Sequence, residues 1–222
     1  MEQDGCNCKQ MRTIHNSLDT SLQTQIYSTL KPTNVFKNYF GNDNPVVIYI
    51  GRIQKRKKLE QIIEALALGQ KQKFEFNVVI VGSTLDNDSV MHLVERYGLC
   101  DKVWFYGPCF DEKNNAQLLY DSSVCVCPAE VGLTAIHALS YGCPVISNDN
   151  FEKQMPEFES IIEGKTGSFY RENDISDLLT KIMYWCKLSD TRRMQIRKDT
   201  RKLILSEWSV DYQIKVLKEL LK

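Results

Sequence analysis

Short apolar runs alternate with segments of helical periodicity over most of this chain. The runs have strand length and are apolar at nearly every position; they lie at 46–50, 76–81, 103–106, 124–127, 143–146 and 167–170. After the first run, Leu59, Ile62, Ile63 and Leu66 fall at i, i+3, i+4 and i+7. Strands without a polar face are covered on both sides. The pattern therefore predicts a Rossmann-like α/β fold, a parallel sheet with helices on both faces.

Helical periods are expected between the strands and after the last one. They are predicted near 59–69, 90–97, 112–120, 133–141, 178–185 and 190–206, with a terminal helix that carries Ile214, Leu217 and Leu221. Residues 1–44 show no such alternation of strand and helix.

Composition and charge describe an ordinary globular protein. Of its 222 residues 43% are hydrophobic and 25% charged, and Lys plus Arg balance Asp plus Glu at 28 each. No overall field favours nucleic acid, and none is expected as a partner. Basic residues gather between Arg192 and Lys202 on a predicted helix beside Asp190 and Asp199. We interpret this segment as a solvated helix face.

The eight cysteines do not indicate a zinc site or a disulfide framework. Cys125 and Cys127 share one face of a strand, and most of the others are scattered without the C-x₂-C spacing of zinc ligands. Cys6 and Cys8 could bind a metal with a distant histidine, but a metal site there is not favoured. No apolar run approaches the roughly 18 residues of a membrane span. We expect no metal and a cytoplasmic location, either free or peripheral at the inner membrane face.

The turn after the fourth strand is the strongest candidate for chemistry. A small-residue turn follows the strand, and a helix opens on Gly132. The free backbone N–H groups of such a helix, here those of Leu133 and Thr134, attract an anion, most often a phosphate. Arg52 and Lys57 follow the first strand, and carboxyl ends of parallel strands meet at one edge. The sequence therefore predicts a diphosphate site.

A series of motifs occurs in one order along residues 45–187. It comprises Gly51-Arg52-Ile53 with Lys57, Val79–Gly82, Val103–Gly107, Leu119-Tyr120, Ala138–Val145, Glu159 five residues ahead of Gly164, and Thr166-Gly167. This series resembles the C-terminal, donor-binding domain of the family-4 retaining glycosyltransferases. Those enzymes have the GT-B architecture of two facing Rossmann-like domains, so the resemblance implies one half of a GT-B fold. The Rossmann fingerprint G-x-G-x-x-G is absent, which disfavours a nicotinamide or flavin enzyme.

The resemblance implies roles for particular residues. Arg52 and Lys57 would stabilise the leaving diphosphate and are the candidate catalytic residues. Other candidates would bind the donor. Tyr106 and Cys109 lie in the loop that would cradle the nucleotide base, and Glu159 would steady a loop near the donor. The remaining ones are Gly51, Gly82, Gly132, Leu133 and Thr134. The resembled family needs no metal and no cofactor beyond the nucleotide-diphosphate sugar itself.

Two departures from the family pattern concern the donor site. The family carries two glutamates seven residues apart, and Ala129 and His137 occupy the matching positions here. Glu130, one residue past the first, would reach the site only in a rebuilt turn. His137 either binds a ribose hydroxyl or is a packed histidine, and both readings stay open. Lys58 stands where the family usually has glycine.

We therefore expect three parts and one leading function. Residues 1–44 would be a remnant of an N-terminal domain and its linker, 45–187 the nucleotide-sugar-binding domain and 188–222 C-terminal helices. The chain would serve retaining, metal-independent sugar transfer in glycan biosynthesis, in a pathway such as bacterial surface polysaccharide. Its partners would be a nucleotide sugar, a glycan or lipid-linked acceptor and a separate N-terminal GT-B domain. The alternatives are an incomplete nucleotide-sugar-binding module and a fragment of a nucleotide-sugar epimerase.

Overall fold

The sheet has six strands in the order β3-β2-β1-β4-β5-β6, and all five pairings are parallel. The computed structural model describes residues 12–83 and 88–221, so Cys6 and Cys8 lie outside the described residues. The strands are β1 Val46–Ile50, β2 Asn77–Val81, β3 Val103–Gly107, β4 Val124–Cys127, β5 Val145–Asn148 and β6 Gly167–Tyr170. The predicted Rossmann-like α/β fold is confirmed.

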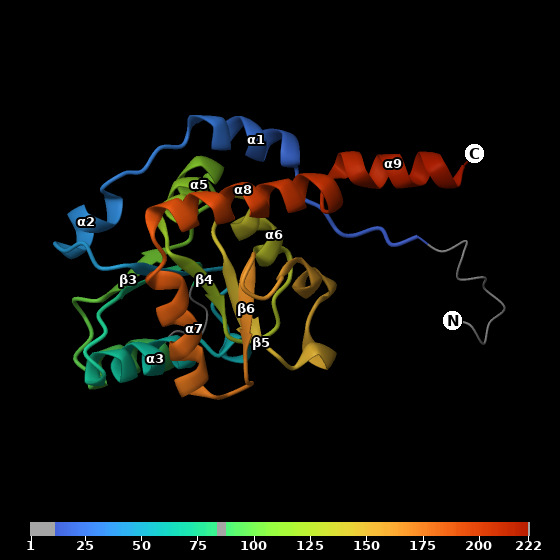
Figure 1. Ribbon diagram of the computed structural model, residues 1–222. Helices are drawn as coiled ribbons and strands as arrows, with labels where there is room; N and C mark the ends of the chain where they lie inside the picture. Colours follow the sequence, from blue (N-terminus) through green and yellow to red (C-terminus); the bar gives the residue numbers. More distant parts are fainter. Residues whose placement is uncertain (1–11, 84–87, 222) are drawn as a thin grey trace.

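Helices cover both faces of this sheet (Figure 1). One face carries α3 (Glu60–Lys71), α4 (Asp88–Arg96) and α7 (Ile175–Cys186). The other face carries α1 (Thr20–Thr29), α2 (Val35–Phe40), α5 (Glu112–Asp121), α6 (Leu133–Ser140) and α8 (Asp190–Glu207). The last helix, α9 (Val210–Leu220), extends away from the sheet (Figure 1). Three short 3-10 helices, η3 Lys55–Lys57, η4 Phe151–Lys153 and η5 Pro156–Ser160, lie in loops.

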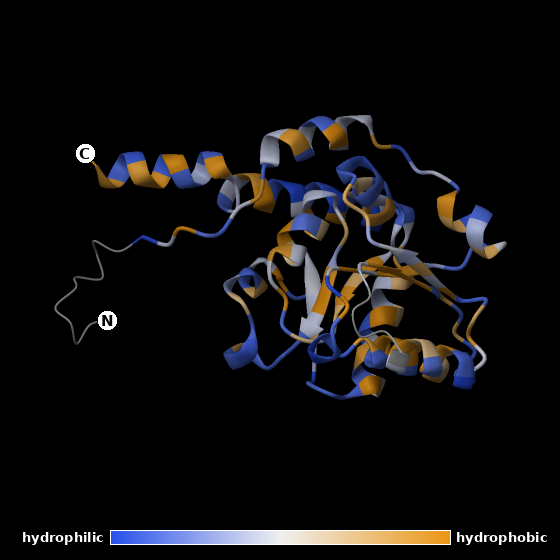
Figure 2. Cartoon of the chain, turned by 180° about the vertical axis from the view of Figure 1, so that it is seen from behind, coloured by the Kyte–Doolittle hydropathy of each residue, from blue (hydrophilic) through white to orange (hydrophobic). Residues whose placement is uncertain are grey.

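Alternate strand residues build two separate cores. Along β1, Val47 and Tyr49 belong to the cluster under α3 and α7, whereas Val46, Ile48 and Ile50 belong to the cluster under α5 and α6. All five residues are buried, because successive side chains of a strand point to opposite faces. The strands are accordingly among the most hydrophobic segments of the chain (Figure 2).

The segment before β1 packs against this domain. Ile26 of α1 and Phe36 of α2 are buried in the core under α5 and α6, while Ile14 and Leu22 remain exposed. The segment thus forms two helices, which the strand–helix pattern did not indicate. The proposed division at residues 44 and 187 stays a prediction.

Arginines of α8 close the ends of three helices. Arg193, Arg197 and Arg201 are spaced at i, i+4 and i+8 and are partly buried. They donate to carbonyl oxygens in the last turns of α7, α5 and α6, which belong to Trp185, Tyr120 and Ser140 respectively. The interpretation of this segment as a solvated face is wrong for these three side chains, because a cation at a helix C-terminus satisfies free carbonyl groups and the helix dipole.

Arg201 also ties α1 to the domain, and this predicts a stability effect. Its guanidinium lies 3.8 Å from the ring centre of Tyr27 and donates to Ser140 O over 2.7 Å. We expect Arg201→Ala to lower the free energy of unfolding by about 2 kcal/mol, because it removes a charge-assisted hydrogen bond and a cation–π contact. Urea denaturation measures this change, and Lys202→Ala, on the exposed face of α8, is the control. Equal losses in the two variants would contradict the assignment.

Candidate functional site

The loops after β1 and β2 approach each other closely at the carboxyl edge of the sheet. Gly51 has φ +149°, and its N–H donates to Val81 O over 2.9 Å. A Cβ on Gly82 would collide with the carbonyl oxygen of Gly51. The buried Tyr49 donates its hydroxyl to Arg52 O over 2.8 Å, which fixes the position of this loop. Glycine is needed at Gly82 because two backbones lie in contact, and at Gly51 because its φ lies in a region that other residues rarely adopt.

The N-terminus of α6 faces this loop. Gly132 is the N-cap, and the Ala135 N–H bonds to the Gly132 carbonyl over 2.9 Å. The backbone N–H groups of Leu133 and Thr134 have no hydrogen-bond partner within 12–83 and 88–221. The Thr134 hydroxyl reaches Ile50 O over 3.4 Å, which joins α6 to the end of β1. Two free donors and the positive end of the helix dipole are therefore presented beside Arg52.

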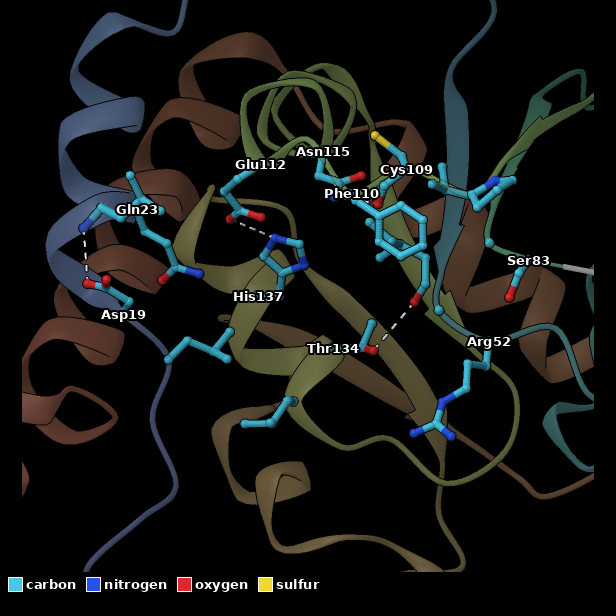
Figure 3. Close-up of a pocket in the computed structure, with 18 residues that line it drawn as sticks. Asp19, Gln23, Arg52, Ser83, Cys109, Phe110, Glu112, Asn115, Thr134 and His137 are labelled. Carbon is cyan, nitrogen blue, oxygen red and sulfur yellow. Dashed lines mark hydrogen bonds and ion pairs between the residues drawn. The ribbon is translucent and has the colours of Figure 1, made fainter.

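Arg52 is the cation available at this point. Its side chain is exposed, and no hydrogen bond or ion pair joins its guanidinium to another described residue. Figure 3 places Arg52 beside Thr134, at the end of β1. A planar guanidinium next to free N–H groups can bind two oxygens of one phosphate.

Two cavities meet here, each of about 540 Å³. They share Gly51, Arg52, Leu133 and Thr134. The first cavity is bounded mainly by α1, the start of α5 and the loop after β3. The second is bounded mainly by η3, the turn after β4 and the segment around η5. The junction of the two cavities is thus the free N-terminus of α6.

A polar cluster lines the first cavity. His137 Nε2 lies 3.0 Å from Glu112 Oε1, which also accepts from the Tyr141 hydroxyl over 2.6 Å. Gln23 of α1 hydrogen-bonds the same carboxylate. Because a carboxylate accepts, Nε2 carries the hydrogen, so in a neutral ring Nδ1 is an acceptor. Figure 3 shows this second nitrogen turned away from Glu112, toward the side of Thr134 and Phe110.

A charged cluster lines the second cavity. The Glu130 carboxylate pairs with Lys57 Nζ at 3.0 Å and with Arg56. Lys57 also donates to Glu130 O over 3.1 Å. Burial raises the pKa of Glu130, but the hydrogen bond from Lys57 and the charges of Lys57 and Arg56 outweigh it and lower the pKa below its ordinary value. Glu130 is therefore held as an anion by two cations.

Lys58 keeps the backbone conformation that a glycine would adopt. Its φ is +54°, in the left-handed region. Its ammonium turns to Glu172 Oε1 at 3.0 Å and Asn173 Oδ1 at 2.9 Å, and it lines neither cavity. Lys58 thus has a backbone conformation that glycine adopts readily, and its side chain stays out of both cavities.

The structure brings together most of the residues that the sequence singled out. The first cavity contains Gly51, Arg52, Gly82, Cys109, Leu133, Thr134 and His137. The second contains Gly51, Arg52, Lys57, Glu130, Gly132, Leu133 and Thr134.

Two of the candidates line neither cavity. Tyr106 packs beside Trp104, with ring centres 5.0 Å apart, while its neighbours Cys109 and Phe110 reach the first cavity. Glu159 is exposed and lies 3.6 Å from His15 Nε2. Glu157, two residues earlier, lines the second cavity instead. The role of Glu159 in steadying a loop near the donor stays a prediction.

Sequence reasoning missed three contributions to the cavities. Gln23 belongs to a segment that lacks the strand–helix pattern. Glu112 follows the N-cap Asp111, and an acidic residue in the first turn of a helix is common, so its position gave no sign of a site. Glu157 follows a proline in a loop. The only available signal was that α5 follows β3 directly at the same sheet edge.

Within the described residues there is no group of three or more His, Cys, Asp or Glu placed to hold a metal, and no helix is long and apolar enough to cross a membrane.

The Glu112 cluster predicts a pH effect. Burial raises the pKa of Glu112, but the hydrogen bond and charge of His137, the Tyr141 hydroxyl and Gln23 outweigh it and lower the pKa below the ordinary 4.5. A lowered folded-state pKa adds stability that is present above pH 4.5 and is lost as the pH falls through the folded value. We expect the stability difference between the wild type and Glu112→Gln to shrink in this range. Urea unfolding between pH 7 and pH 3 measures it, and a constant difference would contradict the cluster's role.

Comparisons with known proteins agree with this architecture. The structure of the Anabaena protein HepE in complex with UDP is similar, with a TM-score of 0.74 and 18% identity, over 99% of this chain and 60% of that one. The uncharacterized 41.2 kDa protein in the cps region of Klebsiella pneumoniae is 23% identical over 178 residues, which are 79% of this chain and 45% of that protein. The putative glycosyltransferase EpsD of Bacillus subtilis is 25% identical over 146 residues, 66% of this chain and 37% of EpsD.

The chain thus spans less than half the length of these two relatives. A family model, "Glycosyl transferases group 1", matches residues 31–203, which include the whole sheet and both cavities' shared residues. The chain belongs to the group 1 glycosyltransferases.

Proposed function

We propose that this chain binds a nucleoside-diphosphate sugar and is the donor half of a retaining, metal-independent glycosyltransferase. The observation that carries the proposal is the junction of the two cavities. There the N–H groups of Leu133 and Thr134 and the guanidinium of Arg52 lie together, and none of them has a hydrogen-bond or ion-pair partner among the described residues. Such an arrangement suits a doubly charged diphosphate better than a neutral ligand.

The two cavities suit the two ends of such a ligand. The nucleoside would occupy the first cavity, where Phe110 is 94% exposed and offers an aromatic face to a base, and where His137 can bind a ribose hydroxyl. The sugar would occupy the second cavity, among Lys57, Glu130 and Glu157. Because HepE was crystallised with UDP, uridine is the base we would test first.

Positive charge at the junction would drive the reaction. As the bond between the sugar and the diphosphate breaks, negative charge gathers on the leaving phosphate. In this proposal the Arg52 guanidinium, the Lys57 ammonium and the N–H groups of α6, all of which line the second cavity, would stabilise that charge. In this proposal the side chains and the helix supply the charge that a metal supplies in other transferases.

The acceptor side of the reaction would come from a second domain. The matched region covers 45% and 37% of the length of two relatives, so each of them has further chain beyond it. Along α9 the apolar residues Ile214, Leu217 and Leu220 are exposed on a helix that leaves the sheet (Figures 1 and 2). We infer a glycan or lipid-linked acceptor, and a role in polysaccharide biosynthesis at the inner face of a membrane, from the resemblance of residues 131–137 to surface-polysaccharide transferases.

Removing the guanidinium of Arg52 tests the junction. We expect Arg52→Ala to weaken UDP binding roughly 10- to 100-fold, the loss of one charge-assisted contact. Titration calorimetry without divalent metal measures it. Lys55→Ala, which removes an exposed charge from the same loop, is the matched control and should change little. Unchanged affinity in Arg52→Ala would rule out the diphosphate position.

Activity of the isolated chain separates a transferase half from a binding module. Transfer requires the acceptor within roughly 3–3.5 Å of the anomeric carbon. We expect the chain alone to bind its donor and hydrolyse it slowly at most, and to transfer sugar once an N-terminal GT-B domain is added. A product assay with radiolabelled donor follows both steps. Rapid transfer by the chain alone would contradict the proposal, and no transfer with any added domain would favour the binding module.

A further inference from the structure

Glu157 is a buried carboxylate whose hydrogen bonds are incomplete. The residue is 2% exposed and lies in η5. Its Oε1 accepts from Asn16 Nδ2 over 2.8 Å, while Oε2 has no hydrogen-bond partner in the described part of the chain. Burying a carboxylate with a single amide partner is costly. Oε2 therefore lacks the donor that this position requires.

The carboxylate lies beside the cavity junction. Oε2 is 3.9 Å from the point where a Cβ on Gly132 would stand, so it adjoins the N-cap of α6, and Glu157 lines the second cavity. The Met155 side chain approaches the same point to 3.8 Å and also lines this cavity. Met155 is 50% exposed, and methionine is a flexible side chain, so a ligand that reaches the buried Oε2 would have to displace it.

The two carboxylates of the second cavity differ in what they can offer a ligand. Glu130 is paired with Arg56 and Lys57. No ion pair within the described residues includes Glu157, whose carboxylate accepts from the neutral amide of Asn16. Ala129, which occupies the position of the family's sugar-side glutamate, cannot accept a hydrogen bond through its side chain. Glu157 thus keeps an acceptor oxygen and its charge for whatever enters the cavity.

We propose that Glu157 accepts a hydrogen bond from a hydroxyl group of the donor sugar and thereby selects a neutral sugar over a sugar acid. This inference rests on the proposed function. A hydroxyl supplies the hydrogen that Oε2 lacks, and the hydrogen bond is strong because the acceptor is charged. A sugar carboxylate has no hydrogen to donate at neutral pH and is repelled by the buried negative charge.

Comparing the diphosphate with its sugar conjugate tests this role. Calorimetry would measure the affinities of the wild type and of Glu157→Gln for each bare diphosphate and its sugar conjugate. The two pairs are UDP with UDP-glucose and GDP with GDP-mannose. We expect the variant to keep its affinity for the bare diphosphate within about threefold, or to bind it more tightly, and to lose roughly 10- to 100-fold for the sugar conjugate. Glu159→Gln, two residues away and exposed, is the matched control and should change neither affinity.

The wild-type protein provides a second measurement that needs no variant. UDP-glucuronate and GDP-mannuronate carry a carboxylate at C6 and should bind at least roughly 10-fold more weakly than UDP-glucose and GDP-mannose. Equal affinities for the neutral and acidic sugars would overturn the proposal. The proposal would also be overturned if Glu157→Gln lost the same affinity for the diphosphate as for its sugar conjugate, or if it lost no affinity for either. If neither UDP nor GDP binds the wild type, the proposed function fails, and this inference fails with it.

Discussion

The free N-terminus of α6 is the feature on which the rest of the site depends. Leu133 and Thr134 lie in the first turn of α6, where N–H groups have no acceptor within the helix, and neither N–H has another partner in the described part of the chain. In the turn before the helix, the Val131 N–H donates to Gln154 Oε1 over 2.8 Å. Gln154 in turn donates to Ser147 Oγ and Asn148 O, both over 3.0 Å. The turn is therefore fixed by the end of β5, and the helix dipole points at a defined place.

Strand order brings the other half of the site to that place. β1 lies next to β4, so the loop that carries Gly51 and Arg52 ends opposite the turn before α6. This is the point where the strand order reverses, at which ligands of open α/β sheets bind. The loop after β1 and the N-terminus of α6 line both cavities, which therefore meet at the helix N-terminus. A ligand with two different ends and a charged middle fits that division.

The sequence was sufficient for the sheet and for the junction. Short, β-branched apolar runs such as 46–50 indicate buried strands, and the Gly132 turn signals a helix start, so Arg52, Leu133 and Thr134 were predicted together. Contacts between distant segments were not predictable. Nothing in the pattern brings Gln23 and Glu112 to His137, and the arginines of α8 read as solvent-facing until the ends of α5, α6 and α7 are placed beside them. Glu157 lies in η5, a short 3-10 helix within a loop, and no strand or helix period in the sequence indicates where that loop runs.

A crystal structure of the chain with UDP is the most direct test of the central claim. We expect the diphosphate over the N-terminus of α6, within hydrogen-bonding distance of Leu133 N or Thr134 N and of the Arg52 guanidinium, with uridine in the first cavity. Phosphates held elsewhere, for example by the exposed lysines of α8, or uridine in the second cavity, would contradict it.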